Sequence, residues 1–116
     1  MRLVLVNPPQ PYLIEKQTQV PLGLLYLAAV LKRDCPKIDL KVVDTSPMSI
    51  TEAVEAVGEA DIYGFTSTSL DYHTVQELKE ALSAHHPASI FILGGPHAAI
   101  FSKDVLKEGF DHVEAL

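Results

Sequence analysis

The chain of 116 residues has one cysteine and few basic residues. Cys35 has no second thiol for a disulfide and no second thiolate for zinc or an iron–sulfur cluster, so we interpret it as a small residue ending a helix. Nine Lys and Arg against fifteen Asp and Glu give a formal net charge of −6. Such a chain offers no cationic surface, and we expect no nucleic-acid and no membrane partner.

Long hydrophobic runs are also missing. The longest, residues 21–31, is well below the ~20 residues that cross a bilayer. Arg2 is followed at once by a strand pattern rather than by the apolar core of a signal peptide. We therefore expect a soluble, cytoplasmic protein. With 47% apolar residues, residues 1–116 are enough for one domain and too few for two.

Several motifs of common α/β proteins are absent. No G-x-G-x-x-G follows the first strand, no P-loop is present, and no hydrolase elbow brings Ser, His and acid together. A phosphoacceptor domain needs carboxylates at the first and third strand exits, where Asn7 and Thr66 stand instead. We expect no catalytic residue and no metal ligand within this chain.

Periodic patterns predict alternating strands and helices. Strands are expected over residues 3–6, 38–44, 61–66, 89–93 and 112–115, the second of them half exposed at a sheet edge. Helices are expected over residues 21–33, from the capping box Ser49–Glu52 to Val57, after a cap at Asp71, and over residues 102–108 before Gly109.

This alternation predicts an α/β fold: a doubly wound parallel five-stranded sheet in a three-layer α/β/α arrangement, flavodoxin-like or, more broadly, Rossmann-like. With the second strand at the edge, the expected strand order is 2-1-3-4-5. Ligands of such sheets bind beyond the carboxyl ends of the strands where the strand order reverses, here between the first and third strands.

The helix over residues 21–33 has almost no polar face, with an apolar run from Leu22 to Leu31. A helix on one side of a sheet needs only an apolar stripe. Two interpretations stay open: tight packing in a small domain, or a surface for another domain or subunit.

Three segments should meet at the expected crevice: Asn7 to Pro9, Thr66 to Ser69, and Gly94 to His97. The hydroxyls of Thr66, Ser67, Thr68 and Ser69 precede a helix, where they either grip a ligand oxygen or only cap the helix. Gly94 and Gly95 either let a bulky ligand reach the backbone or only form a tight turn.

Five motifs in register resemble one family. They are Asn7-Pro8-Pro9, Pro21-Leu22-Gly23-Leu24-Leu25-Tyr26-Leu27-Ala28, a strand ending at Asp44, Gly64-Phe65-Thr66-Ser67, and Gly94-Gly95-Pro96-His97-Ala98. Together they resemble the cobalamin (B12)-binding domain that precedes the radical SAM barrel in cobalamin-dependent methyltransferases and in cyclases of the magnesium-protoporphyrin ester cyclase type. The resemblance spans essentially the whole chain.

The resemblance implies a cofactor site. Ser67, Thr68 and Ser69 would face the nucleotide tail of cobalamin, Gly94 and Gly95 would let backbone approach it beside Pro96 and His97, and Leu22 and Gly23 would lie near the corrin. Asn7, Pro8 and Thr66 complete the expected site at the strand exits. The tail phosphodiester needs no basic cluster if backbone N–H groups and hydroxyls contact it.

The sequence also departs from related patterns. Many cobalamin proteins supply a cobalt ligand from an Asp-x-His-x-x-Gly motif after the first strand, but residues 10–20 contain no histidine. We therefore expect base-off cobalamin without a protein histidine on cobalt, and we interpret His73 as a solvated residue. Whether His97 touches the ligand or fixes the turn stays open.

The resemblance thus implies a module that binds cobalamin, with its cobalt, for a radical SAM methyltransferase or cyclase. No Cys-x-x-x-Cys-x-x-Cys motif is present. S-adenosylmethionine and the 4Fe-4S cluster would then belong to a downstream domain, with this chain an N-terminal part of a longer protein. The helix over residues 22–31 would contact that radical SAM domain or another subunit. The alternative is a flavodoxin-like domain that binds flavin or a nucleotide, or acts as a non-catalytic interaction module.

Overall fold

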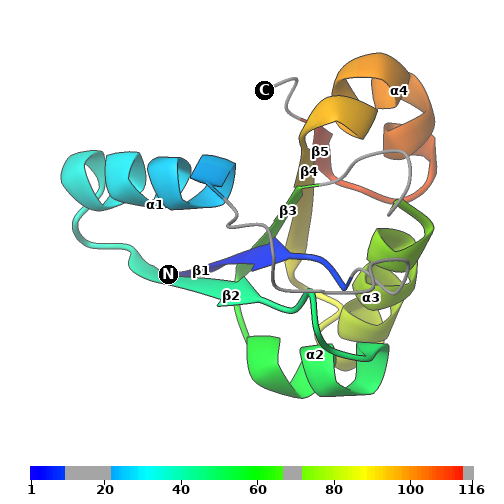
Figure 1. Cartoon of the computed structure of the whole chain (residues 1–116), viewed down its shortest axis with the longest axis horizontal. Helices are drawn as coiled ribbons and strands as arrows, with labels where there is room; N and C mark the ends of the chain where they lie inside the picture. Colours follow the sequence, from blue (N-terminus) through cyan, green and yellow to red (C-terminus); the bar gives the residue numbers. More distant parts are fainter. Residues whose placement is uncertain (10–21, 67–71, 114–116) are drawn as a thin grey trace.

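The computed structural model describes residues 1–9, 22–66 and 72–113 (Figure 1). Its elements follow one another as strand, helix, strand from end to end. They are β1 Arg2–Asn7, α1 Leu22–Asp34, β2 Asp39–Asp44, α2 Ile50–Val57, β3 Ile62–Thr66, α3 Tyr72–His85, β4 Ile90–Gly94, α4 Pro96–Lys107 and β5 His112–Val113. Of these helices none is long and apolar enough to cross a bilayer.

Every strand pairing in the sheet is parallel, in the order β2-β1-β3-β4-β5. The predicted α/β fold with a parallel sheet is confirmed. So is the 2-1-3-4 order of the four longer strands, with β2 half exposed at the edge. Of the expected fifth strand over residues 112–115, the structure describes only His112–Val113, which pairs with β4, and residues 114–115 lie outside the described residues. The described sheet thus has four longer strands, with the two described residues of β5 beside β4.

Alternating residues of β1 face two separate cores. Val4 and Val6 are fully buried in the larger core, which also takes residues from α2, α3 and Val105 of α4. Leu3 and Leu5 point the other way into a smaller core with Ala28 of α1. Figure 1 shows α1 on one side of the sheet and α2 and α3 on the other. Both faces of β1 are thus covered, as its unbroken apolar run predicts.

The smaller core leaves much of α1 exposed. Ala28 is buried, whereas Leu25, Tyr26 and Leu27 are exposed, Tyr26 to 75%. Tight packing is therefore the wrong explanation for the apolar composition of this helix in the isolated chain. The apolar residues of α1 exceed what the sheet beneath them can bury.

Helix starts follow local chemistry. The capping box of α2 is confirmed: Glu52 N–H donates to Ser49 Oγ (3.3 Å) and Ser49 N–H donates to Glu52 Oε1 (3.2 Å). The expected boundary of the last helix is wrong, because α4 begins at Pro96 rather than at residue 102. Proline suits the first helical position, since it has no N–H to leave unpaired there.

The segment 94–97 is accordingly a helix start rather than a simple turn. Gly95 is the N-cap residue with φ +92°, and Pro96 and His97 form the first turn of α4. The helix is kinked at Phe101, whose backbone is non-helical (φ −116°, ψ 35°). This break separates the part that sequence periodicity predicts, residues 102–108, from the part it misses.

Candidate functional site

The carboxyl ends of the parallel strands lie along one edge of the sheet. Asn7 is in register with Asp44, and Thr66 with Gly94. Strand order reverses between β1 and β3, because β2 lies on one side of β1 and β3 on the other. Three of the predicted strand exits therefore do meet at one edge, where ligands of open α/β sheets bind.

Asn7 ties β1 to the segment that follows β2. Its Nδ2 donates to Asp44 Oδ1 (3.0 Å), and its carbonyl oxygen accepts from Thr45 Oγ1 (2.6 Å) and from Thr45 N–H (2.9 Å). Asn7, Pro8, Thr45 and Ser46 are all buried. These contacts give the exit of β1 a fixed geometry, and they engage Asn7 within the protein.

Partial burial raises the pKa of Asp44, but hydrogen bonds from Asn7 and Ser46 outweigh it, and the net pKa lies below the usual value. The N–H of Ser46 donates to the same oxygen, Asp44 Oδ1 (3.0 Å). Asp44 is therefore an ionised carboxylate at neutral pH. Its charge stabilises the connection after β2.

A groove of about 830 Å³ runs between α1 and the sheet, and we call it the α1 groove. The sheet supplies its floor through Leu3, Leu5, Gly64 and Ile92, and α1 supplies a wall through Tyr26, Leu27, Val30 and Leu31. Thr66, Gly94 and Gly95 line it at the carboxyl edge, and Arg33 lies at the C-terminal end of α1. The groove thus joins the strand exits to an apolar trough along the α1 face.

Gly64 keeps the floor of this groove low. It lies in the row Leu5–Gly64–Ile92 across three strands. A Cβ built on Gly64 would lie 2.8 Å from Leu5 Cδ2, closer than non-bonded carbon atoms approach at their optimum of about 3.5–4.0 Å. Any side chain there would push Leu5 aside and fill the trough.

The sequence matches the B12 binding domain family over residues 16–115, nearly the whole chain. The chain belongs to the B12-binding domain family. Among solved structures it is similar to the N-terminal domain of a hypothetical protein from Thermotoga maritima, with 25% identity and a TM-score of 0.53 over 90% of this chain and 93% of that one. No curated protein matches.

The expected site residues of this B12-binding domain divide into four groups. Thr66, Gly94 and Gly95 line the α1 groove. Asn7 and Pro8 are buried at the exit of β1, while Leu22, Gly23, Pro96 and His97 lie in the first turns of α1 and α4. Ser67, Thr68 and Ser69, like the proposed cap Asp71, lie outside the described residues.

Sequence reasoning missed most of the groove. Leu5 and Ile92 belong to no motif, and Gly64 opens the motif Gly64-Phe65-Thr66-Ser67 but was not assigned to the site. The run of residues 3–6 predicts burial on both faces without showing the groove beside one of them. Strand alternation does place Leu5 opposite Val4 and Val6. That signal, combined with the glycine at position 64, would have indicated a row of residues with little side-chain volume on the face of the sheet beneath α1.

Among the histidines whose side chains the structure describes, none lines the α1 groove. His73 Nε2 contacts Glu77 Oε1 at 2.8 Å on the exposed side of α3, so its interpretation as a solvated residue is confirmed. Among residues 1–9, 22–66 and 72–113, no group of three or more His, Cys, Asp and Glu side chains could hold a metal ion.

Proposed function

We propose that this B12-binding domain holds cobalamin by inserting the nucleotide tail into the α1 groove, as the cofactor module of a radical SAM methyltransferase or cyclase. The observation that carries the proposal is the groove itself. It reaches the carboxyl edge of the sheet at the ends of β3 and β4, and at Gly64, Gly94 and Gly95 it is lined by backbone that carries no side chain. Its volume lies within the ~300–1,000 Å³ typical of small-molecule sites.

The lining of the groove matches the two ends of a nucleotide tail. Leu3, Leu5 and Ile92 on the floor and Val30 on the wall form apolar surroundings, which favour burial of a flat aromatic base. Thr66 at the carboxyl edge offers a hydroxyl, and Gly95 caps the N-terminus of α4. Free N–H groups at such a terminus suit a phosphodiester, so the acidic chain needs no basic cluster there.

The remaining expected contacts belong to the same proposal. Leu22 and Gly23 at the start of α1 would lie near the corrin, Ser67, Thr68 and Ser69 would face the tail, and Pro96 and His97 would lie beside it. Asn7 and Pro8 would act by fixing the exit of β1, because Asn7 is already engaged with Asp44 and Thr45. The bound form would be base-off, with no protein histidine on cobalt.

Within a larger enzyme, cobalamin supplies methyl transfer or cobalt-based radical chemistry, and this chain binds and orients it. The radical SAM setting rests on the resemblance of five motifs to that group. S-adenosylmethionine and a 4Fe-4S cluster would act in a downstream domain.

Retention of cobalamin tests the proposal. The purified domain, mixed with hydroxocobalamin and desalted, should keep about one corrinoid per chain, measured by its visible absorbance. Gly64→Val should abolish this retention, because the new side chain and the displaced Leu5 would fill the trough. Unchanged retention by Gly64→Val would remove the α1 groove from the site.

Ala84→Val is the matched control. Ala84 is exposed on α3, which packs on the opposite face of the sheet, so the substitution adds comparable bulk away from the groove. It should retain cobalamin like the wild-type domain. Loss of cobalamin from every sample, including wild type, with the fold intact by circular dichroism, would favour the interaction-module alternative.

A further inference from the structure

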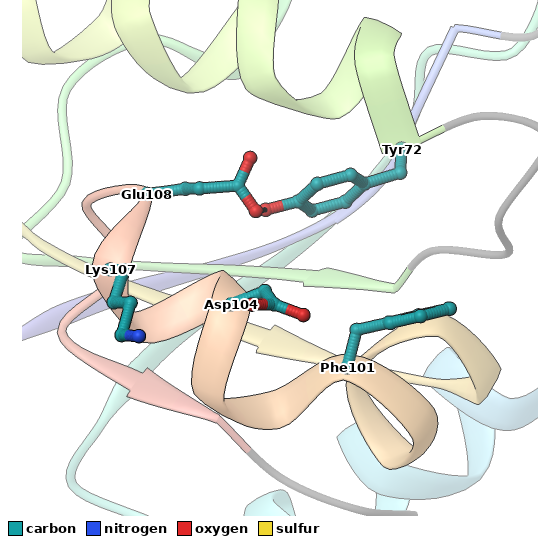
Figure 2. A pocket seen from close by; sticks show the side chains of 5 residues that line it. All are labelled: Tyr72, Phe101, Asp104, Lys107 and Glu108. Carbon is teal, nitrogen blue, oxygen red and sulfur yellow. Dashed lines mark hydrogen bonds between the residues drawn. The ribbon is translucent and has the colours of Figure 1, made fainter.

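A second hollow lies on the opposite face of the molecule, between α3 and α4. It has a volume of about 460 Å³ and is lined by Tyr72, Phe101, Asp104, Lys107 and Glu108. Figure 2 shows Phe101 and Asp104 projecting side by side from α4, with Tyr72 and Glu108 above them. We call this hollow the α3–α4 notch.

The kink in α4 builds the notch. Phe101 is the non-helical residue, and Asp104 follows in the next turn. Because the helix changes direction at Phe101, its ring and the Asp104 carboxylate both reach toward the hollow beneath Tyr72. Phe101 is 41% exposed there.

The two carboxylates of the notch differ in their surroundings. Glu108 is held in place, since its Oε1 accepts from Tyr72 Oη (3.3 Å) and its Oε2 accepts from Gln76 Nε2 (2.6 Å). Asp104 is exposed, and within the described part of the chain its carboxylate makes no salt bridge. Asp104 is therefore the carboxylate that a ligand can reach.

The interior of the notch is electrostatically negative. The pKa of Tyr72 rises to about 12, first because the hydroxyl is buried and then because Glu108 and Asp104 place negative charge near it. Lys107 also lines the hollow, on the far side of Asp104 from Phe101 in Figure 2. A cation entering beside Phe101 would meet an aromatic face and a carboxylate together.

We propose that the α3–α4 notch binds a guanidinium group, stacked on Phe101 and paired with the carboxylate of Asp104. A planar guanidinium forms two parallel hydrogen bonds to a carboxylate and stacks on aromatic rings, whereas an ammonium is a point charge. The group could belong to a free small molecule or to an arginine side chain of a protein. The notch lies on the face of the sheet opposite α1, because α4 contributes Val105 to the core on that face.

The test is an NMR titration of the ¹⁵N-labelled domain with two probes, ethylguanidinium and N-acetylarginine amide. We expect saturable shifts of the amides of residues 101–108 at millimolar concentrations. Saturation by both probes would identify a site for free guanidines, and saturation by the arginine amide alone a site for protein arginine. N-acetylcitrulline amide, which is neutral but similar in shape, should cause no saturable shift.

Substitutions distinguish binding in the α3–α4 notch from non-specific attraction of a cation to an acidic protein. Asp104→Asn should weaken binding about tenfold, the size of a lost charged hydrogen bond, and Phe101→Leu should weaken it several-fold. Glu55→Gln removes the same charge from an exposed position on α2 and should leave the affinity unchanged. Equal binding by Asp104→Asn and wild type, or equal shifts with the citrulline probe, would overturn the proposal.

Discussion

At the scale of single residues, two glycines near the α1 groove have different roles. Gly95 has φ +92°, a conformation that a β-branched side chain adopts only under strain. Gly64 lies in a regular strand, and its missing side chain leaves room for the side chain of Leu5 on the neighbouring strand β1. A substitution at Gly95 therefore tests the start of α4 as much as the ligand site, whereas one at Gly64 tests the groove.

Asp44 joins the exits of β1 and β2 through one oxygen, which accepts from Asn7 Nδ2 and from Ser46 N–H. Because these bonds favour the ionised form, the folded-state pKa of Asp44 is below its ordinary value. The stabilisation is complete above the unfolded pKa of about 3.9 and is lost as the pH falls through the lower folded pKa.

This linkage gives a pH-dependent prediction. Asp44→Asn should lower the free energy of unfolding by about 1 kcal/mol at pH 7, a modest value because the group is partly solvated. The difference from wild type should shrink below about pH 4. Urea unfolding at pH 7 and pH 3 measures both. Asp39→Asn, at an exposed carboxylate 3.8 Å from Arg2, is the control, and a difference for Asp44→Asn that did not depend on pH would contradict the argument.

At the scale of elements, α1 leaves several apolar side chains exposed. Leu25 is 45% exposed and lies next to the exposed Tyr26 and Leu27. Contiguous apolar residues on a surface mark a ligand groove or a contact with another protein; Tyr26 and Leu27 line the α1 groove, and Leu25 lies outside its lining. The exposure supports our proposal that α1 contacts a downstream radical SAM domain or another subunit.

In the isolated domain we expect α1 to drive weak self-association. Sedimentation velocity should show a sedimentation coefficient that rises with protein concentration, and Leu25→Lys should abolish the rise because it places a charge in the contact. Leu106→Lys changes an equally exposed leucine on α4, 49% exposed, and should leave the rise unchanged. A strictly monomeric wild-type domain would indicate that the exposed face of α1 does not bind itself.

The elements that sequence predicts best are those whose signals are local. The capping box of Ser49 and Glu52 predicts α2, and an apolar stripe expected at Val75, Leu78, Ala81, Leu82 and His85 predicts α3. Val75, Leu78 and Leu82 are buried, whereas His85 at the end of the helix is exposed. The first half of α4 was missed because its kink at Phe101 breaks the periodicity. Pro96 after Gly95 was the available signal for that start.

At the scale of the whole molecule, the strand order follows from the alternation of strands and helices along the chain and from the half-polar sequence of β2. The carboxyl edge of the sheet could therefore be predicted as the place of the site. The length of the α1 groove could not. It depends on how far α1 stands from β3 and β4, a tertiary distance that no local pattern encodes. The positions of Thr66, Gly94 and Gly95 were predicted for this reason, while Gly64 and Ile92 were not.

The proposed insertion of the tail predicts how the whole domain responds to ligand. A ligand that binds only the folded state stabilises it by about 2.7 kcal/mol at a hundredfold excess over its Kd, which for a domain of this size raises Tm by on the order of 10 °C. Hydroxocobalamin should produce such a rise in a thermal melt followed by circular dichroism. Cobinamide keeps the corrin ring but lacks the nucleotide tail, so it should raise Tm by far less. Equal stabilisation by both compounds would mean that the protein recognises the corrin alone and that the α1 groove stays empty. The missing side chain at Gly64 can affect binding only if part of the ligand enters the groove.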